Sequence, residues 1–280
     1  MPELPEVTVH AERLNQLYHS QTIVSVSALA ISAMKNLVAS SSQVRGQQIQ
    51  AISSHGKYLI IEGSPYTFVV HLMQGGRLTP DTKNSRKPRG GLFRWAFEQG
   101  PSLLLTEAGK EHRAGVWGFS DRVGAGEALF AELGPPANEI SAAELEKILS
   151  AAGGSRIHGV LRDQRAIAGL GRRLANEICW TARISPFASA TSVRDRHLTD
   201  LHSAIVNCVD ESIIDERSRD VMVNSANRLA HVHHRDSQPC DRCGDQIRTV
   251  SYNVYTVFYC ATCQTDGKIL ADNTTSKFLK

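Results

Sequence analysis

The sequence predicts an α+β protein in which a strand-rich half is followed by a helical half and a short cysteine-rich hairpin. Three observations lead to this fold class. Short strand-like runs separated by glycine and proline turns fill most of the chain up to residue 133. Helical periodicity dominates after Gly134-Pro135-Pro136. Four of the six cysteines then gather near the C-terminus. The 280 residues are enough for two hydrophobic cores.

The strand-rich half opens with a predicted helix over residues 5–19, where Val9, Leu14 and Leu17 recur at roughly helical spacing. The predicted strands are 22–31, 48–52, 57–62, 67–72, 92–97, 103–106 and 116–119. Strands this short and numerous are typical of a sandwich or a barrel.

The second half is predicted to be helical over 142–151, 156–162, 171–181, 194–214 and 217–230, with Ser141 as an N-cap. We therefore place domains at 1–133, 134–236 and 237–280, the last holding the cysteines in a Tyr/Val-rich hairpin pattern.

The chain carries a net charge of +3, and no apolar run approaches the length of a membrane span. No basic segment followed by an apolar core opens the sequence, so we expect a cytoplasmic protein. The basic residues include an acid-free run, which indicates either a solvated loop or a phosphate-facing one. The run consists of Lys83, Arg86, Lys87, Arg89 and Arg94.

The first six residues, Met-Pro-Glu-Leu-Pro-Glu, offer a candidate nucleophile. Removal of Met1 would leave Pro2 with a free secondary amine, which titrates near pH 8 and is partly neutral at pH 7. Its attack on an electrophilic carbon would give an iminium ion, and Glu3 could transfer protons there. The alternative is that this segment only begins a surface helix.

Cys240-x2-Cys243 and Cys260-x2-Cys263 have the spacing of a tetrahedral zinc site with four thiolate ligands. Such a site has no open position, so we expect one structural Zn²⁺. A pair of disulfides is the alternative, which a reducing compartment disfavours.

Residues 163–171 form a predicted glycine turn that ends at Gly171, where a helix begins. Backbone N–H groups at a helix start can bind an anion such as a phosphate. Glycine turns between helices are common, so the pattern alone is not specific.

Taken together, several motifs occur in one order: the Pro-Glu start, Gly56-Lys57-Tyr58-Leu59, His71-Leu72, Arg113-x-Gly115-x-Trp117, the glycine turn and the four cysteines. This order resembles the formamidopyrimidine-DNA glycosylase/endonuclease VIII family over nearly the whole chain. The resemblance implies a β-sandwich, then a helix–two-turn–helix domain and a zinc-finger hairpin. It also implies a monomeric base-excision repair enzyme that binds damaged double-stranded DNA.

By this resemblance, Pro2 attacks C1′ of a flipped nucleotide, Glu3 protonates the opening sugar, and Lys57 contacts phosphate and assists strand nicking. These three residues are the predicted catalytic group of a DNA glycosylase and AP lyase. The predicted DNA contacts are His71, Gln74, Arg89, Arg113, Gly171, Arg172 and Tyr255.

The sequence departs from the family at several DNA-reading positions. Gln74 and Ala114 stand where the family has Met and Phe to fill the gap left by the flipped base, and Arg113 is kept. The neighbouring Met73 could take the place of the family's Met. Arg172 replaces the turn asparagine. Tyr255 replaces the phosphate-binding arginine of the finger, which puts δ-elimination in question. His158 stands in place of a lysine.

The segment between residues 214 and 240 lacks the loop that covers flipped 8-oxoguanine in the family, so we expect a preference for oxidised pyrimidines or hydantoins. Two other functional interpretations remain. The chain could be a damaged-DNA-binding protein without activity, or a zinc-ribbon nucleic-acid module that uses only residues 240–263.

Overall fold

The computed structural model describes residues 1–36, 41–108, 113–120, 122–223, 227–252 and 255–270. The chain forms two compact units, Met1–Leu133 and Gly134–Lys280. Each unit is described by itself below, and the division into three domains stays a prediction. Among the described residues, no helix combines the length and the apolar character that crossing a bilayer requires.

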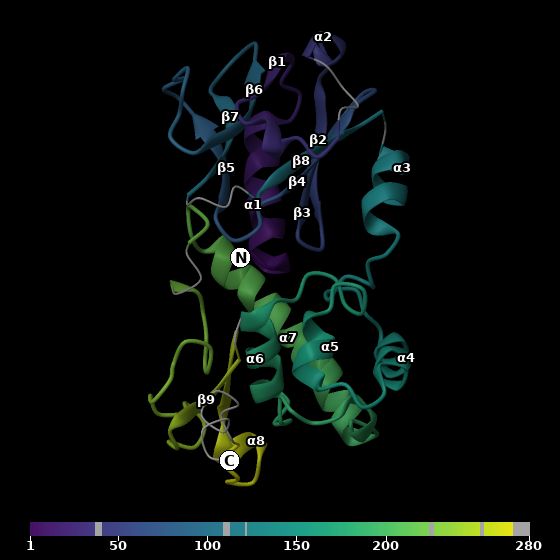
Figure 1. The fold of residues 1–280 in the computed structure, drawn as a ribbon, viewed down its shortest axis with the longest axis vertical. Coiled ribbons are helices and arrows are strands. Elements are labelled where there is room, and N and C mark those ends of the chain that lie inside the picture. Colours follow the sequence, from purple (N-terminus) through teal and green to yellow (C-terminus); the bar gives the residue numbers. More distant parts are fainter. Residues whose placement is uncertain (37–40, 109–112, 121, 224–226, 253–254, 271–280) are drawn as a thin grey trace. The chain divides into compact units, whose positions relative to one another are not determined.

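Two four-stranded antiparallel sheets build the first unit, with the orders β1-β6-β7-β5 and β2-β3-β4-β8 (Figure 1). Apolar side chains such as Leu59, Val69 and Trp95 are fully buried. The predicted β-sandwich is therefore confirmed, and all seven predicted strands are present with shifted ends. The strands are β1 (Ile23–Ala28), β2 (Ile49–His55), β3 (Tyr58–Gly63), β4 (Thr67–His71), β5 (Gly76–Asp81), β6 (Gly91–Phe97), β7 (Ser102–Glu107) and β8 (Gly115–Phe119).

Helix α1 (Leu4–Tyr18) forms where the first helix is predicted and is bonded to both sheets (Figure 1). Asn15 Oδ1 accepts the backbone N–H of Ile52 in β2 at 2.7 Å. His10 Nε2 lies 2.7 Å from the carbonyl oxygen of Leu78 in β5. Because one helix is tied to both sheets, its orientation in this unit is fixed.

Strand β5 is not among the predicted strands, because Pro80 interrupts the run. Proline cannot donate to a ladder, and it is tolerated mainly on edge strands. β5 is an edge strand, which explains the miss. The unit also contains short helices that the sequence pattern does not reveal: α2 (Ser41–Val44), a 3₁₀ turn (Ile31–Ala33), α3 (Arg122–Ala125) and a π-helix (Gly126–Phe130).

The second unit consists of helices followed by a hairpin, as predicted. Leu174 and Ile178 of α6 are fully buried, and Trp180 of the same helix packs against Ile247 and Phe258 of the hairpin. The helices are α4 (Ala142–Ala152), α5 (Ile157–Arg162), α6 (Arg172–Thr181), α7 (Arg196–Arg217) and α8 (Ala261–Gln264), with a 3₁₀ turn at Ala190–Ser192. The hairpin strands are β9 (Ile247–Ser251) and β10 (Thr256–Cys260).

The predicted helix over 217–230 is wrong, because α7 ends at Arg217 and none of the described residues between 218 and 230 is α-helical. Arg219 donates to Asp215 Oδ1 at 2.8 Å, so it closes the end of α7.

Candidate functional site

The segment with the predicted nucleophile begins helix α1. Pro2 and Glu3 are both buried, and Glu3 is 3% exposed. Glu3 is the N-cap residue, and its backbone N–H donates to Oε2 of the buried Glu6 at 2.6 Å. A bond of this kind satisfies an N-terminal backbone group and fixes how the chain enters the helix. Glu6 therefore supports the position of Pro2 and Glu3 and is not a surface carboxylate.

Lys57 lies at the tip of the β2–β3 hairpin. His55 pairs with Tyr58, which leaves Gly56 and Lys57 as a two-residue turn. Gly56 has φ +56° and Lys57 has no positive φ, as in a type II′ turn. A lysine at a hairpin tip is ordinarily exposed, but Lys57 is only 6% exposed. Its charge contributes to the lowered pKa of His71, and it directly precedes Tyr58, the ladder partner of His71.

Two hydrogen bonds set the direction of α1 along β2. The side chain of Asn15 is bonded to the backbone of Ile52. About two helical turns closer to the N-terminus, Thr8 Oγ1 lies 3.1 Å from Ser54 Oγ. Moving toward the start of the helix is therefore moving toward the hairpin tip. From Thr8 the helix continues about 8 Å to Glu3, and from Ser54 the strand continues about 10 Å toward its tip. The N-terminal residues and Lys57 thus lie at the same end of the first unit.

His71 ends β4 and faces the same hairpin, pairing with Tyr58 across the ladder. Its Nδ1 accepts the backbone N–H of Met73 at 3.1 Å. Burial, followed by the charge of Lys57, lowers the pKa of His71 to about 4. The ring is therefore neutral at pH 7 and carries its proton on Nε2. It can offer a DNA phosphate one hydrogen-bond donor but no charge.

The predicted gap-filling residues differ in their placement. Gln74 and Arg113 are exposed, whereas Ala114 is fully buried. The backbone N–H of Ala114 donates to Oε2 of the buried Glu107 at 2.7 Å, which anchors the segment that carries Arg113. The methyl group of Ala114 does not reach the surface. Residues 109–112 lie outside the described part.

The basic run divides into two kinds of residue. Arg94 is held inside the unit, where it pairs with Asp81 at 2.8 Å and donates to the Ser85 carbonyl oxygen at 2.7 Å. The remaining basic residues of the run, Lys83, Arg86, Lys87 and Arg89, are all exposed. A DNA contact by Arg89 stays a prediction, whereas Arg94 has a structural role.

In the second unit, Gln164 organises the predicted glycine turn. Its Oε1 accepts the backbone N–H of Gly169 at 3.0 Å, and its Nε2 donates to the Leu170 carbonyl oxygen at 2.8 Å. Gly169 has φ +100°, which favours glycine. Gly171 is the N-cap of α6 and makes no side-chain cap, and Arg172 is exposed at the first helical position. Gly169, Leu170 and Gly171 are buried, so Arg172 is the residue of this turn that is exposed to an anion.

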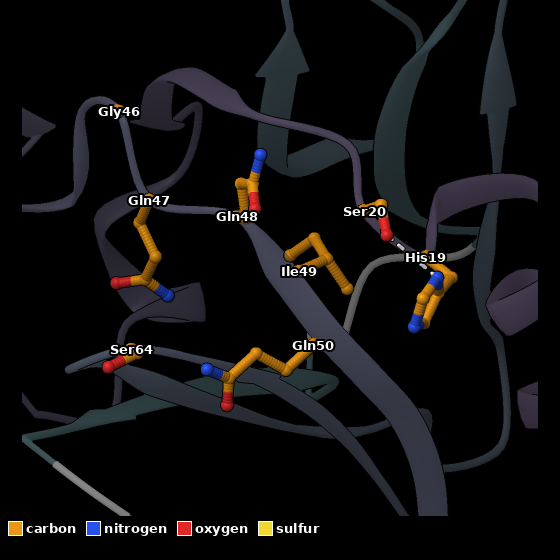
Figure 2. Close-up of a pocket in the computed structure, with 8 residues that line it drawn as sticks. All are labelled: His19, Ser20, Gly46, Gln47, Gln48, Ile49, Gln50 and Ser64. Carbon is orange, nitrogen blue, oxygen red and sulfur yellow. Dashed lines mark hydrogen bonds between the residues drawn. The ribbon is translucent and has the colours of Figure 1, made fainter.

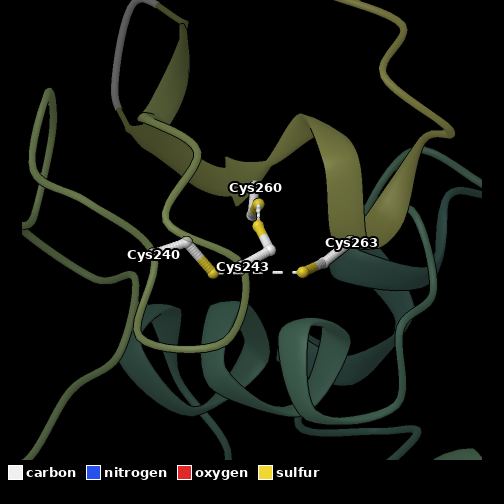
Figure 3. A group of neighbouring side chains, drawn as sticks. All are labelled: Cys240, Cys243, Cys260 and Cys263. Carbon is white, nitrogen blue, oxygen red and sulfur yellow. Dashed lines mark hydrogen bonds between the residues drawn. The ribbon is translucent and has the colours of Figure 1, made fainter.

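The four predicted metal ligands come together at the base of the β9–β10 hairpin (Figure 3). Their sulfur atoms all lie within 4.8 Å of one another, and the Cys243–Cys260 and Cys240–Cys263 pairs are 3.4 and 3.9 Å apart. Sulfurs around a tetrahedral zinc lie about 3.8 Å apart, given Zn–S bonds of about 2.3 Å. All four cysteines are free thiols. The donor set therefore fits one four-coordinate metal ion and not two disulfides.

The arginines beside the cysteines brace this hairpin. Arg242 lies 4.0 Å from the ring centre of Trp180 and donates to its carbonyl oxygen at 2.9 Å. Trp180 Nε1 in turn donates to Cys240 Sγ at 3.3 Å. Arg248 lies 3.8 Å from Asp245. These contacts account for the positions of Arg242 and Arg248 without a role in DNA binding.

Tyr255 stands at the turn of the hairpin, and Arg162 of α5 lies 4.2 Å above its ring. The sequence analysis missed Arg162. A signal was available, because Arg162 follows His158 by four residues and so shares its face of the helix. His158 itself is stacked on Tyr255 at 5.9 Å.

Glu177 was missed as well. This buried carboxylate of α6 accepts three successive backbone N–H groups, from His231 at 2.7 Å, Val232 at 3.1 Å and His233 at 2.8 Å. Burial raises the pKa of Glu177, and the three N–H donors oppose that shift. Glu177 therefore fixes the irregular segment that leads to the first cysteine.

A polar hollow in the first unit is unrelated to these residues (Figure 2). Its lining includes His19, Ser20 and Gln50, beyond the last turn of α1. The helix has 15 residues, so the hollow lies about 20 Å from Pro2. Gln47 within it bonds both the N–H and the carbonyl oxygen of Tyr66 and is structural.

Two family models match the chain. The model for the formamidopyrimidine-DNA glycosylase N-terminal domain covers residues 1–110, and the model for its H2TH domain covers residues 133–222. A Mycobacterium tuberculosis protein described as an uncharacterized formamidopyrimidine-DNA glycosylase-like protein is 37% identical over 150 residues, which are 53% of this chain and 94% of that protein. This chain belongs to the formamidopyrimidine-DNA glycosylase/endonuclease VIII family.

Full-length relatives agree with this assignment. The formamidopyrimidine-DNA glycosylase of Chloroflexus aurantiacus is 28% identical over 281 residues, covering 94% of this chain and 98% of the relative. Solved structures share the fold at 22% identity. MutM bound to DNA with carbocyclic 8-oxo-G has a TM-score of 0.83 and covers 94% of this chain and 100% of its own. Lactococcus lactis Fpg bound to abasic-site DNA has a TM-score of 0.82, with 94% and 99% covered.

The family match includes Pro2, Glu3, Lys57 and His71 in the first unit and the glycine turn in the second. Tyr255 and the four cysteines lie beyond both matched ranges. The roles of the finger residues are therefore inferred from their own contacts.

Proposed function

We propose that this chain is a bifunctional DNA glycosylase and AP lyase that removes oxidised bases from duplex DNA. Family membership supports the glycosylase part, because the full-length relatives carry that name. The observation that carries the proposal is the direction of α1. It brings the buried Pro2 and Glu3 to the end of the unit at which Lys57 and His71 meet.

In this mechanism the damaged nucleotide leaves the base stack so that its C1′ becomes accessible. The secondary amine of Pro2, freed by removal of Met1, forms a bond to C1′ while the bond to the base breaks, and the departing base takes up the proton that the amine loses. Glu3 protonates the sugar ring oxygen, the ring opens and an iminium ion remains. The iminium acidifies C2′; loss of a C2′ proton expels the 3′ phosphate and nicks the strand. Lys57 serves this elimination as phosphate contact and acid–base group.

We further propose that the four cysteines hold one structural Zn²⁺. Four thiolates occupy all positions of a tetrahedral ion, so the ion would stabilise the hairpin fold. In this proposal the ion stabilises the hairpin and takes part in no chemical step.

Borohydride trapping tests the lyase chemistry. Protein whose intact mass shows loss of Met1 is mixed with abasic-site duplex and reduced, and a covalent protein–DNA adduct is expected. Protein that retains Met1, in which the Pro2 nitrogen is an amide, should form no adduct at that nitrogen. Lys57→Ala should still form the adduct but nick slowly, and Lys87→Ala, which removes an exposed amine of the basic run, should behave like wild type. No adduct from folded, processed, metal-loaded protein would overturn the proposal.

The second candidate function is damaged-DNA binding without chemistry. The burial of Ala114 and the presence of Tyr255 at the hairpin turn favour it, since both change residues that read DNA and neither touches the nucleophile. Tight binding of abasic-site duplex without any trapped adduct would establish this alternative.

We propose that the segment after α7 determines the choice of lesion, and that oxidised pyrimidines or hydantoins are preferred over 8-oxoguanine. Within this segment, Glu177 holds residues 231–233 against α6. Single-turnover excision from matched duplexes measures the preference. Excision of 8-oxoguanine as fast as that of thymine glycol or 5-hydroxyuracil would contradict it.

A further inference from the structure

Two connections between the sheets of the first unit begin and end at paired residues. The first connection, residues 72–75, joins β4, which ends at His71, to β5, which begins at Gly76. The second connection, residues 108–114, joins β7, which ends at Glu107, to β8, which begins at Gly115. Gly76 pairs with Glu107 in one sheet, and His71 pairs with Gly115 in the other. The two connections are therefore neighbours at both ends.

Each connection carries one residue that is predicted to fill the gap left by a flipped base. Gln74 belongs to the first and Arg113 to the second, and both are exposed. Each backbone residue that becomes ordered only on binding weakens the affinity by roughly a factor of ten. Recognition of a lesion by these residues therefore depends on what holds the two connections in place beforehand.

The side chain of Glu107 lies between the two connections and is buried, with 6% of the residue exposed. Its Oε2 accepts the backbone N–H of Ala114 at 2.7 Å, which ties the far end of the second connection back to β7. A Cβ atom on Gly75 would lie 3.2 Å from Cγ of Glu107 and 2.9 Å from the Ala108 carbonyl oxygen, so the first connection packs closely against the same side chain. One side chain thus contacts both connections, each time beside a residue predicted to fill the gap.

The first connection is closed by its own hydrogen bond. The backbone N–H of Gly76 donates to the Leu72 carbonyl oxygen at 2.8 Å. Because this bond spans the whole turn, a contact that positions Gly75 also positions the adjacent Gln74.

We propose that Glu107 is a positioning residue for lesion recognition, whose buried side chain holds the connections that carry Gln74 and Arg113 in one preformed arrangement. Being buried, it acts through these two residues. The inference rests on the proposed function, since it requires a flipped nucleotide whose place in the stack is filled.

A nearby predicted DNA contact, Arg89, is held in a different way. The backbone N–H of Glu107 donates to the carbonyl oxygen of Gly90 at 2.9 Å. A replacement of the Glu107 side chain leaves this backbone bond intact. Binding that depends on Arg89, and not on the lesion, should therefore be kept.

Fluorescence anisotropy measures the ratio of the affinity for a duplex with a stable abasic-site analogue to the affinity for the undamaged duplex. Glu107→Ala should lower this ratio about tenfold and bind undamaged duplex within about twofold of wild type, because only the preformed arrangement is lost. Glu107→Gln should keep the ratio within about threefold of wild type, because its amide oxygen can accept the same N–H.

Gln47→Ala is the matched control. Gln47 is also 6% exposed, and it holds Tyr66 through two hydrogen bonds. Tyr66 directly precedes β4, whereas the first connection directly follows it, so this anchor lies at the opposite end of the strand. The replacement should leave the ratio unchanged.

A double-mutant cycle separates positioning from general destabilisation. Gln74→Ala combined with Arg113→Ala should lower the ratio, and Glu107→Ala added to that background should cause no further change. Gly75→Ala provides a second variant, should Glu107→Ala fail to fold. Its methyl group would be too close to the Ala108 carbonyl oxygen, so it should displace the first connection and lower the ratio as well. Circular dichroism and thermal denaturation verify folding.

Additive effects in this cycle would overturn the inference, as would an unchanged ratio in a folded Glu107→Ala variant or in the variant that lacks both Gln74 and Arg113. Failure of the proposed enzyme activity would appear instead as an absent borohydride adduct while the ratios still follow the cycle, because the binding measurement involves no chemistry. The two failures can therefore be told apart.

Discussion

His10 should make the stability of the first unit depend on pH. It lies in the middle of α1, is 8% exposed, and its Nε2 faces the Leu78 carbonyl oxygen at 2.7 Å. Burial lowers its pKa from 6.5 to about 4. The charges of Arg13 and Arg77 add to this shift, and the bond to Leu78 opposes it. The neutral ring therefore donates from Nε2, and protonation would place a cation in the core.

The sign and the size of the effect follow from this shift. The pKa in the folded protein is below that of the unfolded chain, so the stabilising contribution is fully present above pH 6.5 and is lost as the pH falls through 4. A shift of about 2.5 units at about 1.4 kcal/mol per unit gives about 3 kcal/mol. That amount is a large part of the stability of an ordinary domain.

Hydrogen exchange of α1 amides, corrected for intrinsic rates, measures this contribution between pH 4 and 7. His10→Gln keeps a neutral donor and should flatten the decline in protection toward acid pH. His10→Leu should flatten it equally but lower protection at pH 7 by about 1–2 kcal/mol, because the Leu78 carbonyl oxygen loses its donor. An acid decline in His10→Gln as steep as in wild type would refute the reasoning.

Two further predictions concern the second unit. Glu177→Gln should destabilise it by roughly 1–3 kcal/mol in urea denaturation, since an amide can accept from Val232 and His233 but turns a donor toward His231. Glu177→Ala should lower the free energy of unfolding further. A smaller loss for Glu177→Ala than for Glu177→Gln would contradict this geometry. Chelation should release about one zinc ion per chain and expose the amides of β9 and β10 to exchange while α1 stays protected. Release of no metal from protein purified without chelators would contradict the zinc site.

The elements that could be predicted from sequence are those with a local cause. The strands follow alternation between turn residues, and the cysteines follow a fixed spacing. Strand β5 was not predicted because Pro80 is compatible with a strand mainly at the edge of a sheet, and the order of strands in the sheet cannot be seen in the sequence. The segment after Arg217 has helical composition, but Arg173 of α6 donates to the Leu229 carbonyl oxygen at 3.2 Å, a tertiary contact that no local pattern reveals.

Site residues were predicted where a motif marks them and missed where tertiary contacts define them. Lys57 was singled out through the motif Gly56-Lys57-Tyr58-Leu59, yet its burial depends on neighbouring strands that no local pattern reveals. Glu177 looks like an ordinary helical glutamate, because the three N–H groups that it accepts come 54 to 56 residues later. Arg162 acquires a meaning only when the hairpin turn brings Tyr255 beneath it.

The start of a chain is a difficult place for a catalyst, because terminal residues are usually poorly ordered unless the fold ties them down. Here Pro2 and Glu3 are buried and continue directly into α1. That helix is bonded to β2 through Thr8 and to β5 through His10, so both sheets resist its displacement. If acid pH loosens α1 by protonating His10, the borohydride adduct should decline with the same midpoint as α1 protection. A trapping yield that stays constant while protection falls would show that the nucleophile does not depend on this helix.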